Sequence, residues 1–280
     1  MYYIMERKND GLRKPYDLAA SIVLYNNDLG QLQHCISSFL TTSLNVKLYL
    51  IDNSESDDLG KVSFDSRVSY HHTGANLGFG KAHNIAIRRS IAESPFHLVL
   101  NPDISFNRGT LENIVDFARD NSDVGLIMPK ILNANGELQY LCKRLPSPVT
   151  LILRRFFKDA PAVVDKFLRH YEMREKDYDV IFSAPNLSGC FMFFRSEALQ
   201  SVGGFDERYF MYMEDIDIAR RVHMYYKTVY FPHVQVTHGH ERASYRFNKL
   251  FWMHILSAIK YFNKWGWFYD PERLRINKSI

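Results

Sequence analysis

The first half of the chain alternates short apolar, strand-like runs with helical patterns, and this alternation restricts the fold more than any other feature. Strands are expected at residues 17–25, 46–51, 68–71 and 96–100, and helices at 29–40, 80–92 and 111–119. A strand that is followed by a helix and then by another strand favours parallel pairing, because the helix carries the chain back across the sheet. The sequence therefore predicts an α/β fold with a mixed, mostly parallel sheet.

Composition excludes several classes of protein. The chain has 280 residues, of which 46% are hydrophobic, so it can bury one large core or two modest ones. Its cysteines, Cys35, Cys142 and Cys190, are odd in number and far apart, which argues against a disulfide framework or a zinc site and favours a reducing cytosol. No run approaches the roughly 18 apolar residues of a membrane-spanning helix, so we expect neither secretion nor a transmembrane segment. The net charge of +4 is too small to indicate nucleic-acid binding, but it suits anionic substrates or an anionic membrane face.

Polar residues follow three of the expected strands. The segment LVLNPDISF, residues 98–106, is a buried strand pattern that stops at a proline and ends in one acid, Asp103. Residues 25–27 (Tyr-Asn-Asn) and 52–54 (Asp-Asn-Ser) follow two other strands in the same way. Ligands of open α/β sheets bind beyond the carboxyl ends of the strands, so we expect these polar sets to share one crevice.

A glycine-rich loop at residues 74–80 leads into a helix that begins near Lys81. Backbone amides in such a loop can bind an anion, although a flexible turn that caps a helix explains it equally well. It does not match the dinucleotide fingerprint, because that motif directly follows the first strand, and here the first glycine after that strand is Gly30. The same absence argues against sugar nucleotidyltransferases.

The segment at residues 186–221, NLSGCFMFFRSEALQSVGGFDERYFMYMEDIDIARR, contains a second group of charges. Glu214 and Asp215 open an expected helix, and acids in a first turn complement the helix dipole. Asp217 lies four residues before Arg221, which is the spacing of an ordinary ion pair along a helix. These residues alone do not establish catalysis.

The motifs taken together resemble inverting family 2 glycosyltransferases. LYLIDNSESDD, NLGFGKAHN, LVLNPDISF, NLSGCFMFFRSEAL, GGFDERYFMYMEDIDIARR and VTHGHERAS occur in the order and approximate spacing of that family. The likeness is strongest to bacterial rhamnosyltransferases of O-antigen and cell-wall polysaccharide synthesis, and it covers residues 18–262. It implies a GT-A fold, a nucleotide-diphosphate sugar donor and a divalent metal, Mg²⁺ or Mn²⁺.

The resemblance also implies a donor site. In the family pattern, Asp52 corresponds to the acid that binds the pyrimidine base, although an Asx turn after a strand explains it as well. Lys81 is a candidate contact to the diphosphate, and Arg220 and Arg221 either contact the diphosphate or pair with Asp217. The full set of expected donor-binding residues is Tyr25, Asn26, Asp52, Asn76, Gly78, Lys81, Asn84, Arg220 and Arg221.

Asp103 is the expected metal ligand. Many GT-A enzymes have Asp-x-Asp at this strand end, whereas Asn101-Pro102-Asp103 retains only the second acid. His238 corresponds to a histidine that completes the metal site in related enzymes, and His240, two residues on, competes with it for that role. Carboxylate, imidazole and diphosphate oxygens together suit Mg²⁺ or Mn²⁺. With a single acid, we expect weak metal binding in the absence of the donor.

The expected reaction is a single displacement that inverts the anomeric carbon. It needs one general base to take the proton of the acceptor hydroxyl, and Asp215 is the candidate, with Glu214 as the alternative. We expect L-rhamnose to move from dTDP-L-rhamnose to a lipid-linked saccharide. UDP-galactofuranose or a UDP-N-acetylhexosamine is an alternative donor, and a nucleotide-binding subunit without catalysis is an alternative from another class.

We expect a catalytic domain at residues 1–240, with a nucleotide-binding half at 17–130 and an acceptor-binding half at 131–240. Residues 241–280 contain apolar side chains at helical spacing, followed by Trp267, Phe268 and Tyr269. This helix either packs on the core or holds the enzyme on a membrane. A lipid-linked acceptor favours a cytoplasmic enzyme that is peripheral on the inner face of the bacterial cytoplasmic membrane.

Overall fold

The computed structural model describes residues 14–61, 65–157, 161–239 and 249–280. Its strands are β1 (Leu18–Leu24), β2 (Val46–Asp52), β3 (Val68–His72), β4 (Phe96–Leu100), β5 (Ile104–Phe106), β6 (Val124–Asn133), β7 (Cys142–Lys143), β8 (Phe182–Ser183), β9 (Asn186–Leu187), β10 (Phe191–Arg195) and β11 (Lys227–His238). Its helices are α1 (Leu29–Leu40), α2 (Phe79–Glu93), α3 (Thr110–Asp120), α4 (Pro148–Phe156), α5 (Ala162–Tyr171), α6 (Ser196–Val202), α7 (Glu214–His223), α8 (Lys249–Trp265) and α9 (Pro271–Lys278), with a 3₁₀ turn at Leu59–Lys61.

The main sheet has the order β3-β2-β1-β4-β10-β6-β11-β5, and β8 pairs with β11. Strands β3, β2, β1 and β4 are mutually parallel, and β6 and β11 are parallel to each other. Strand β10 is antiparallel to both β4 and β6, while β5 and β8 are antiparallel to β11. Six of these strands therefore share one direction, which confirms the predicted mixed, mostly parallel sheet.

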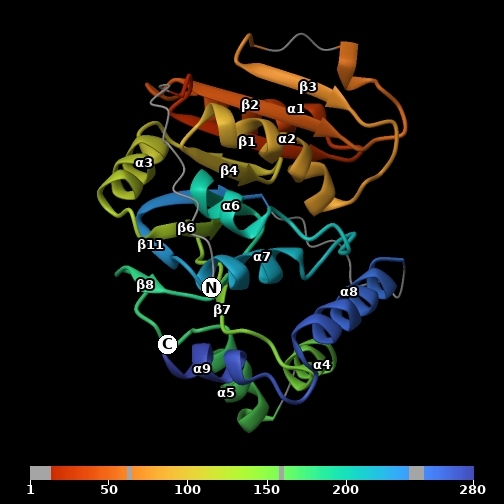
Figure 1. The fold of residues 1–280 in the computed structure, drawn as a ribbon, viewed down its shortest axis with the longest axis vertical. Coiled ribbons are helices and arrows are strands. Elements are labelled where there is room, and N and C mark those ends of the chain that lie inside the picture. Colours follow the sequence, from red (N-terminus) through yellow and green to blue (C-terminus); the bar gives the residue numbers. More distant parts are fainter. Residues whose placement is uncertain (1–13, 62–64, 158–160, 240–248) are drawn as a thin grey trace, which may run out of the picture.

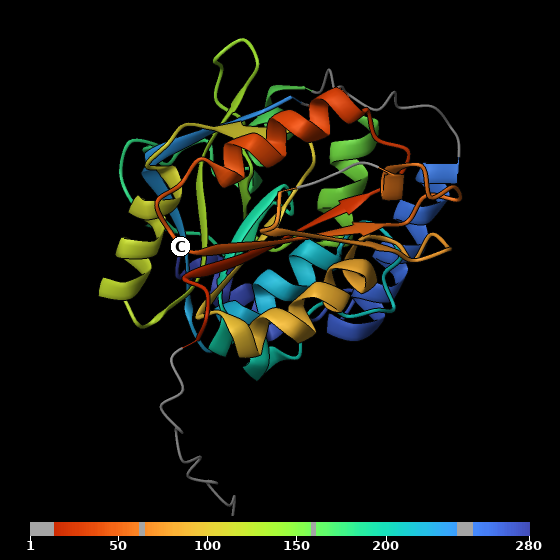
Figure 2. The ribbon, with the colours of Figure 1, turned by 90° about the horizontal axis from the view of Figure 1, so that it is seen from above.

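Helices cover both faces of this sheet. Helix α1 lies on one face, and α2, α6 and α7 lie on the other (Figures 1 and 2). The sequence of α1 shows why it forms where it does, because the Asp28 carboxylate caps its amino end by accepting from Gln31 N at 2.8 Å. Leu32, Ile36 and Phe39 recur at helical spacing along α1 and are buried in the main core.

The predicted elements of the first half are confirmed with small shifts of their ends. Strand β2 continues to Asp52, which pairs in register with Leu24 and His72 and is thus the last residue of the strand rather than the first residue after it. The short strand β5 was not predicted. It follows β4 after a tight turn, and Asp103 lies in that turn.

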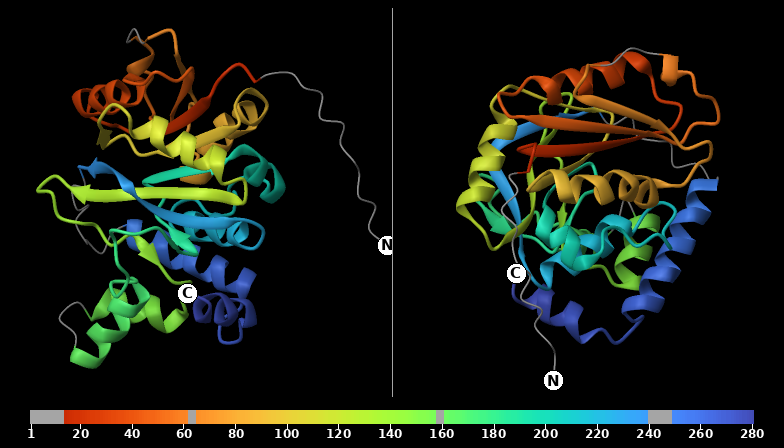
Figure 3. Two further views of the ribbon diagram at one scale, coloured as in Figure 1. Left: turned by 90° about the vertical axis from the view of Figure 1, so that its left-hand side faces the viewer. Right: turned by 45° about the horizontal axis from the view of Figure 1, so that its top comes forward.

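Helices α4, α5, α8 and α9 gather at the end of the molecule opposite β3 (Figures 1 and 3). Two ion pairs of buried α7 side chains, Asp217 and Arg220, tie the last two helices to α7. Lys264 Nζ lies 2.7 Å from Asp217 Oδ1, and Arg220 contacts Asp270 through two hydrogen bonds of 2.7 Å. The C-terminal helices are therefore fixed to the helix that opens with Glu214 and Asp215.

Candidate active site

The polar ends of three neighbouring strands lie at one edge of the sheet, as predicted. Strand β1 pairs in parallel with β2 on one side and β4 on the other, so their carboxyl ends point the same way. Hydrogen bonds join the loops that follow: Asn53 N donates to Leu24 O at 2.9 Å, and Asn26 N donates to Ser54 Oγ at 2.9 Å. Asn26 adopts a left-handed conformation, with φ of 53°, which Asn tolerates better than most residues.

The Asp52 side chain is buried at this edge. Its carboxylate accepts from Ser54 N at 2.8 Å, which is the Asx turn considered above, and from the Tyr70 hydroxyl at 2.8 Å. A carboxylate has about four lone-pair sites, so these two bonds leave it capacity for a further donor. Tyr25, by contrast, is about half exposed at the end of β1.

The loop at residues 74–80 is folded against the protein. Asn76 Oδ1 accepts from Gly78 N at 3.0 Å, and Asn53 Nδ2 donates to Gly78 O at 3.0 Å. Gly78 has φ of +81°, and a Cβ there would lie 2.1 Å from Phe210 O, so only glycine fits. Phe79 N, at the start of α2, donates to the same Phe210 O at 2.9 Å. This amide therefore bonds to the protein rather than facing an anion, while the Lys81 side chain is exposed.

The Asn84 side chain is bonded within the protein. Its Nδ2 donates to Phe205 O at 2.9 Å and to Glu207 Oε1 at 3.0 Å, and its Oδ1 accepts from Phe205 N at 2.9 Å. The side chain is buried. These contacts attach the loop at residues 204–210 to α2 and do not support a direct contact between Asn84 and the donor.

The two arginines of α7 are also engaged within the protein. Arg220 is buried against Asp270, and its guanidinium carbon lies 4.0 Å from the centre of the Trp265 ring. Arg221 donates to Asp217 Oδ2 at 2.7 Å, to Val202 O at 2.6 Å and to Gly204 O at 2.7 Å. The predicted pairing of Arg221 with Asp217 is confirmed, whereas these contacts do not support the predicted contacts of either arginine with the diphosphate.

Asp103 and His238 lie together where β4 and β11 end. Asp103 Oδ2 is 3.3 Å from His238 Nε2, and Gly239 N donates to Asp103 O at 2.9 Å. His238 Nδ1 lies 3.1 Å from Gln139 Oε1, an atom that can only accept, so Nδ1 carries a proton and Nε2 is the ring nitrogen that faces Asp103. His240 lies outside the described residues.

This pair fits two ligands of one divalent ion. Neighbouring ligands of an octahedral ion with bonds near 2.1 Å are about 3 Å apart, close to the observed 3.3 Å. Gln139 orients the imidazole in the way that second-sphere partners of metal ligands do. A cavity of about 320 Å³ next to Asp103 is lined by Asp28, Gln31, Asp103 and Gly239. Among the described residues no group of three or more acidic, histidine or cysteine side chains could hold a metal.

Asp215 is linked to the Asp103 edge through a short connection. Its Oδ2 accepts from Gly189 N at 3.1 Å and its Oδ1 from Ile216 N at 2.8 Å. The carbonyl of the next residue, Cys190, accepts from Asn101 N at 2.9 Å, two residues before Asp103. Residues 189 and 190 thus join the first turn of α7 to the end of β4.

Glu214 differs from its neighbour. It is buried, and its Oε2 has no hydrogen-bond partner among the described residues. Burial raises the pKa of Glu214 to about 8, and the Asp215 charge acts in the same direction. Tyr212 and Met213, which precede it, have φ of 69° and 68°. Two successive non-glycine residues in this conformation are strained, and such strain occurs often at functional sites.

Several polar residues near the site carry no signal in the sequence. Gln139 and Asp28 were missed because they lie 99 and 75 residues from the side chains they accompany, His238 and Asp103. Lys143 lies on the two-residue strand β7. Burial lowers its pKa to about 8, Arg154 adds to this, and the Asp215 charge opposes it. Only the packed structure shows that these residues belong to one region.

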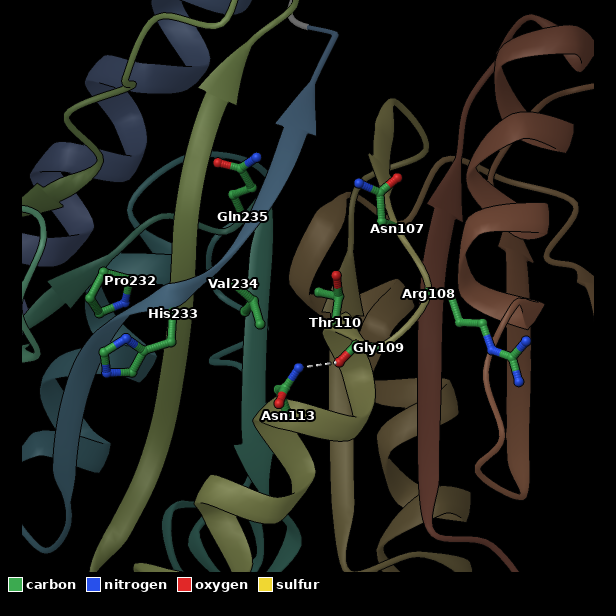
Figure 4. Close-up of a pocket in the computed structure, with 9 residues that line it drawn as sticks. All are labelled: Asn107, Arg108, Gly109, Thr110, Asn113, Pro232, His233, Val234 and Gln235. Carbon is green, nitrogen blue, oxygen red and sulfur yellow. Dashed lines mark hydrogen bonds between the residues drawn. The ribbon is translucent and has the colours of Figure 1, made fainter.

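A second cavity, of about 290 Å³, lies between the loop that follows β5 and the middle of β11 (Figure 4). Its lining includes Asn107, Thr110, His233 and Gln235, and none of the nine described residues that line it is acidic. Asn113 turns back to donate to Gly109 O at 2.8 Å. Without a carboxylate, this cavity lacks the acid that the expected metal site and the expected general base both need.

The mixed, mostly parallel sheet, with polar residues at the carboxyl ends of β1, β2 and β4, is an α/β fold whose ligands bind at that edge. Comparison with known proteins then gives the family. The profile of glycosyl transferase family 2 matches residues 20–203, which is more than half of the chain, and the chain belongs to this family. The predicted enzyme class, a hexosyltransferase, is confirmed.

Curated relatives extend over most of the chain. It is 28% identical over 267 residues to the N-acetylglucosaminyl-diphospho-decaprenol L-rhamnosyltransferase of Mycobacterium tuberculosis, covering 86% of this chain and 83% of the relative. It is 26% identical over 224 residues to the rhamnosyltransferase WbbL of Escherichia coli K12, covering 77% and 81%. The predicted resemblance to rhamnosyltransferases is thereby confirmed.

Solved structures show the same fold. A structure of GalNAc-T7 with UDP, GalNAc and Mn²⁺ matches with a TM-score of 0.62 at 16% identity, covering 83% of this chain and 45% of that chain. Staphylococcus aureus TarS (residues 1–349) matches with a TM-score of 0.53 at 14% identity, covering 80% and 60%. These matches confirm the predicted GT-A fold. Within the described ranges, no helix has both the length and the apolar character needed to cross a bilayer.

Proposed function

We propose that the enzyme transfers L-rhamnose from dTDP-L-rhamnose, with inversion, to a lipid-linked saccharide in surface polysaccharide synthesis. The observation that carries the proposal is the connection between Asp103–His238 and Asp215 through residues 189 and 190. It brings a candidate metal-binding pair and a candidate base to one edge of the sheet. The rhamnosyltransferase relatives support rhamnose as the sugar.

The donor nucleotide binds at the carboxyl ends of β1 and β2. Asp52 accepts the imide N–H of thymine with its remaining lone pairs, and Tyr25 and Asn26 lie beside it. Asn76 and Gly78 shape the adjacent loop, and the exposed Lys81 reaches the diphosphate. Three of the expected residues support the donor site without touching the donor: Asn84, Arg220 and Arg221. Their polar atoms hydrogen-bond to the loops and helices that form the site.

Asp103 and His238 would hold Mg²⁺ or Mn²⁺ together with oxygens of the donor diphosphate. The bound ion supplies Lewis-acid stabilisation of the negative charge that forms on the leaving diphosphate. Gln139 keeps the His238 Nε2 lone pair directed at this position.

Asp215 acts as the general base. The acceptor oxygen forms a bond to the anomeric carbon, the bond from that carbon to the diphosphate breaks, and the hydroxyl proton goes to the Asp215 carboxylate. Asp215 is only partly buried and is oriented by two backbone N–H groups. Glu214 is less suited, because a buried carboxyl with a pKa of about 8 is mostly protonated at neutral pH.

The acceptor side is the half at residues 131–240, beyond the nucleotide-binding half at 17–130, and within the C-terminal segment at 241–280 the described residues, 249–280, carry α8 and α9. A lipid-linked acceptor, of the kind named for the mycobacterial relative, places the enzyme peripherally on the inner face of the cytoplasmic membrane. A UDP-sugar such as UDP-galactofuranose or UDP-N-acetylglucosamine is the second candidate donor. It is favoured by the match to a structure that contains UDP and GalNAc.

A transfer assay with a donor panel tests the proposal. dTDP-L-rhamnose, UDP-galactofuranose and UDP-N-acetylglucosamine are supplied in turn with Mn²⁺ and a short-chain N-acetylglucosaminyl-diphospho-polyprenol, and the anomeric configuration of the product is determined by NMR. We expect rhamnose transfer with inversion, lost in Asp215→Asn. Transfer from a UDP-sugar and not from dTDP-L-rhamnose would show that the proposed donor is wrong. Donor binding without transfer to any saccharide acceptor would contradict the proposed reaction.

A further inference from the structure

Helix α8 has two apolar faces, and among the residues that the structure describes only one of them packs against the rest of the protein. Tyr261 and Phe262 are buried with Tyr209 and Met213 in a small core of their own. On another side of the same helix, Trp252, Leu256 and Ile259 follow one another at i, i+4 and i+7 and are 64%, 56% and 39% exposed. A globular protein needs only the first face for folding.

Helix α4 repeats this arrangement. Leu151 packs against the core that contains Tyr261 and Phe262. Val149, Ile152 and Phe156, at i, i+3 and i+7, are 56%, 54% and 57% exposed. Two neighbouring helices thus each leave an apolar stripe uncovered, which is more than the scattered single apolar residues of an ordinary surface.

The two helices lie side by side. The Arg155 guanidinium carbon is 5.2 Å from the centre of the Phe251 ring, and both helices contact the same small core. Figures 1 and 3 show α4 against α8 at the end of the molecule away from β3, with α5 and α9 next to them. We call the six residues Val149, Ile152, Phe156, Trp252, Leu256 and Ile259 the apolar face.

Charge indicates what covers this face. The stretches at residues 148–157, 161–171 and 249–280 carry ten lysines and arginines against three aspartates and glutamates, a formal charge of +7. Lys264 pairs with Asp217 and Arg154 with Glu172, acids outside these stretches, so the excess is smaller at the surface but stays positive. The whole chain carries only +4, so the remainder is acidic. A second copy of the chain would bring an equal positive charge to the same face, whereas an anionic bilayer attracts it. Aromatic residues beside basic ones are also typical of membrane interfaces.

We propose that the apolar face docks the enzyme on an anionic lipid bilayer, with α4 and α8 lying in the interface. The inference rests on the proposed lipid-linked acceptor and deepens it by naming the surface and the lipid charge. Ser257 Oγ donates to Met211 O at 2.7 Å, and Lys264 pairs with Asp217. Docking through α8 therefore fixes the first turn of α7, with Asp215, close to the membrane where the acceptor saccharide lies.

Vesicle co-sedimentation tests this inference without any transfer reaction. Wild-type protein is mixed with phosphatidylglycerol-containing vesicles and with pure phosphatidylcholine vesicles, at low and high salt. We expect binding to the anionic vesicles that weakens with salt. Trp252→Glu and Ile152→Glu should each reduce it about tenfold, because they remove apolar contact and add a charge that anionic lipid repels.

The matched control is Tyr225→Glu, which makes the same change at an aromatic residue that is 70% exposed after α7, outside the apolar face. It should bind vesicles like the wild type. Donor titration and circular dichroism should be unchanged in all three variants, which separates lost docking from lost folding and from a failure of the proposed reaction. Wild type that does not bind anionic vesicles, equal losses in Tyr225→Glu and Trp252→Glu, or a dimer that Trp252→Glu dissociates would each overturn the inference.

Discussion

The two ends of α7 carry similar side chains and have opposite surroundings. At its amino end, Asp215 is partly buried and accepts from Gly189 N, and Glu214 keeps one oxygen without a hydrogen-bond partner in the part of the chain described. Asp217, still in the first turn, receives Arg221, Lys264 and the Trp265 indole, and towards the carboxyl end Arg220 is paired with Asp270. The charges that form ion pairs hold α7 to the C-terminal helices, whereas Asp215, which is oriented by backbone N–H groups, is the candidate for chemistry.

The largest expected effect is at Asp215. Asp215→Asn removes the general base while keeping the shape of the side chain, so kcat should fall about 10²–10⁴-fold with little change in the thermal midpoint. Glu214→Gln is the matched control. Because Glu214 is already mostly protonated at neutral pH, replacing its carboxyl by an amide should lower kcat much less. Steady-state kinetics of both variants tests this assignment. A larger loss of kcat in Glu214→Gln than in Asp215→Asn would make Glu214 the general base.

The other end of α7 should respond in stability rather than in catalysis. Arg220→Met leaves the buried Asp270 carboxylate without its partner and should lower the free energy of unfolding by about 3–5 kcal/mol. Urea denaturation measures this change. Arg275→Met, which removes a pair in which the arginine is 72% exposed, should cost only about 0–1 kcal/mol. If the Arg220→Met variant were as stable as the wild type but did not bind the donor, the result would favour a direct contact between Arg220 and the diphosphate.

A smaller effect concerns support of the metal-binding pair. Gln139→Ala removes the acceptor that orients His238, so Mn²⁺ affinity in the presence of donor should fall about 10- to 100-fold. Calorimetric titration of Mn²⁺ gives this value. Affinity equal to that of the wild type would show that Gln139 has no part in the site.

The smallest expected effect is a change of stability with pH, and it comes from a buried hydrogen-bond network that lies outside α7. Ser21 Oγ lies 2.7 Å from His83 Nδ1 and 2.8 Å from His97 Nε2. Burial lowers the pKa of His97 to about 3 and lowers that of His83 as well. In the unfolded chain a histidine has a pKa near 6.5, so below that pH the unfolded chain binds protons that the folded protein does not. The contribution of these histidines to the free energy of unfolding is therefore constant above pH 6.5 and falls as the pH drops towards 3.

Between pH 7 and pH 6 the two histidines should together remove about 1 kcal/mol from the free energy of unfolding. Denaturation curves at a series of pH values measure the change, and His97→Gln should make it shallower. Stability that rises on acidification over this range would contradict the neutral assignment of both rings.

The sequence predicted the elements that depend on local pattern. The helix at residues 29–40 was predicted in full, because its cap and its apolar spacing are local, and the polar strand ends follow from the alternation of strands and helices. It did not predict the bonds that side chains make to distant partners. Asn84 bonds to Phe205, 121 residues away, and Arg220 bonds to Asp270, 50 residues away. Such pairings depend on tertiary packing, which periodicity and spacing do not reveal.

The most direct test of the central claim is calorimetric titration of dTDP-L-rhamnose with and without Mn²⁺, on the wild type, Asp103→Asn and Asp116→Asn. Asp116 is an exposed acid of α3 and serves as the control for a lost charge. We predict donor binding that Mn²⁺ strengthens in the wild type and in Asp116→Asn, with that metal effect lost in Asp103→Asn. Donor binding that is the same with and without Mn²⁺ in all three proteins would contradict a metal site at Asp103 and the metal-assisted mechanism built on it.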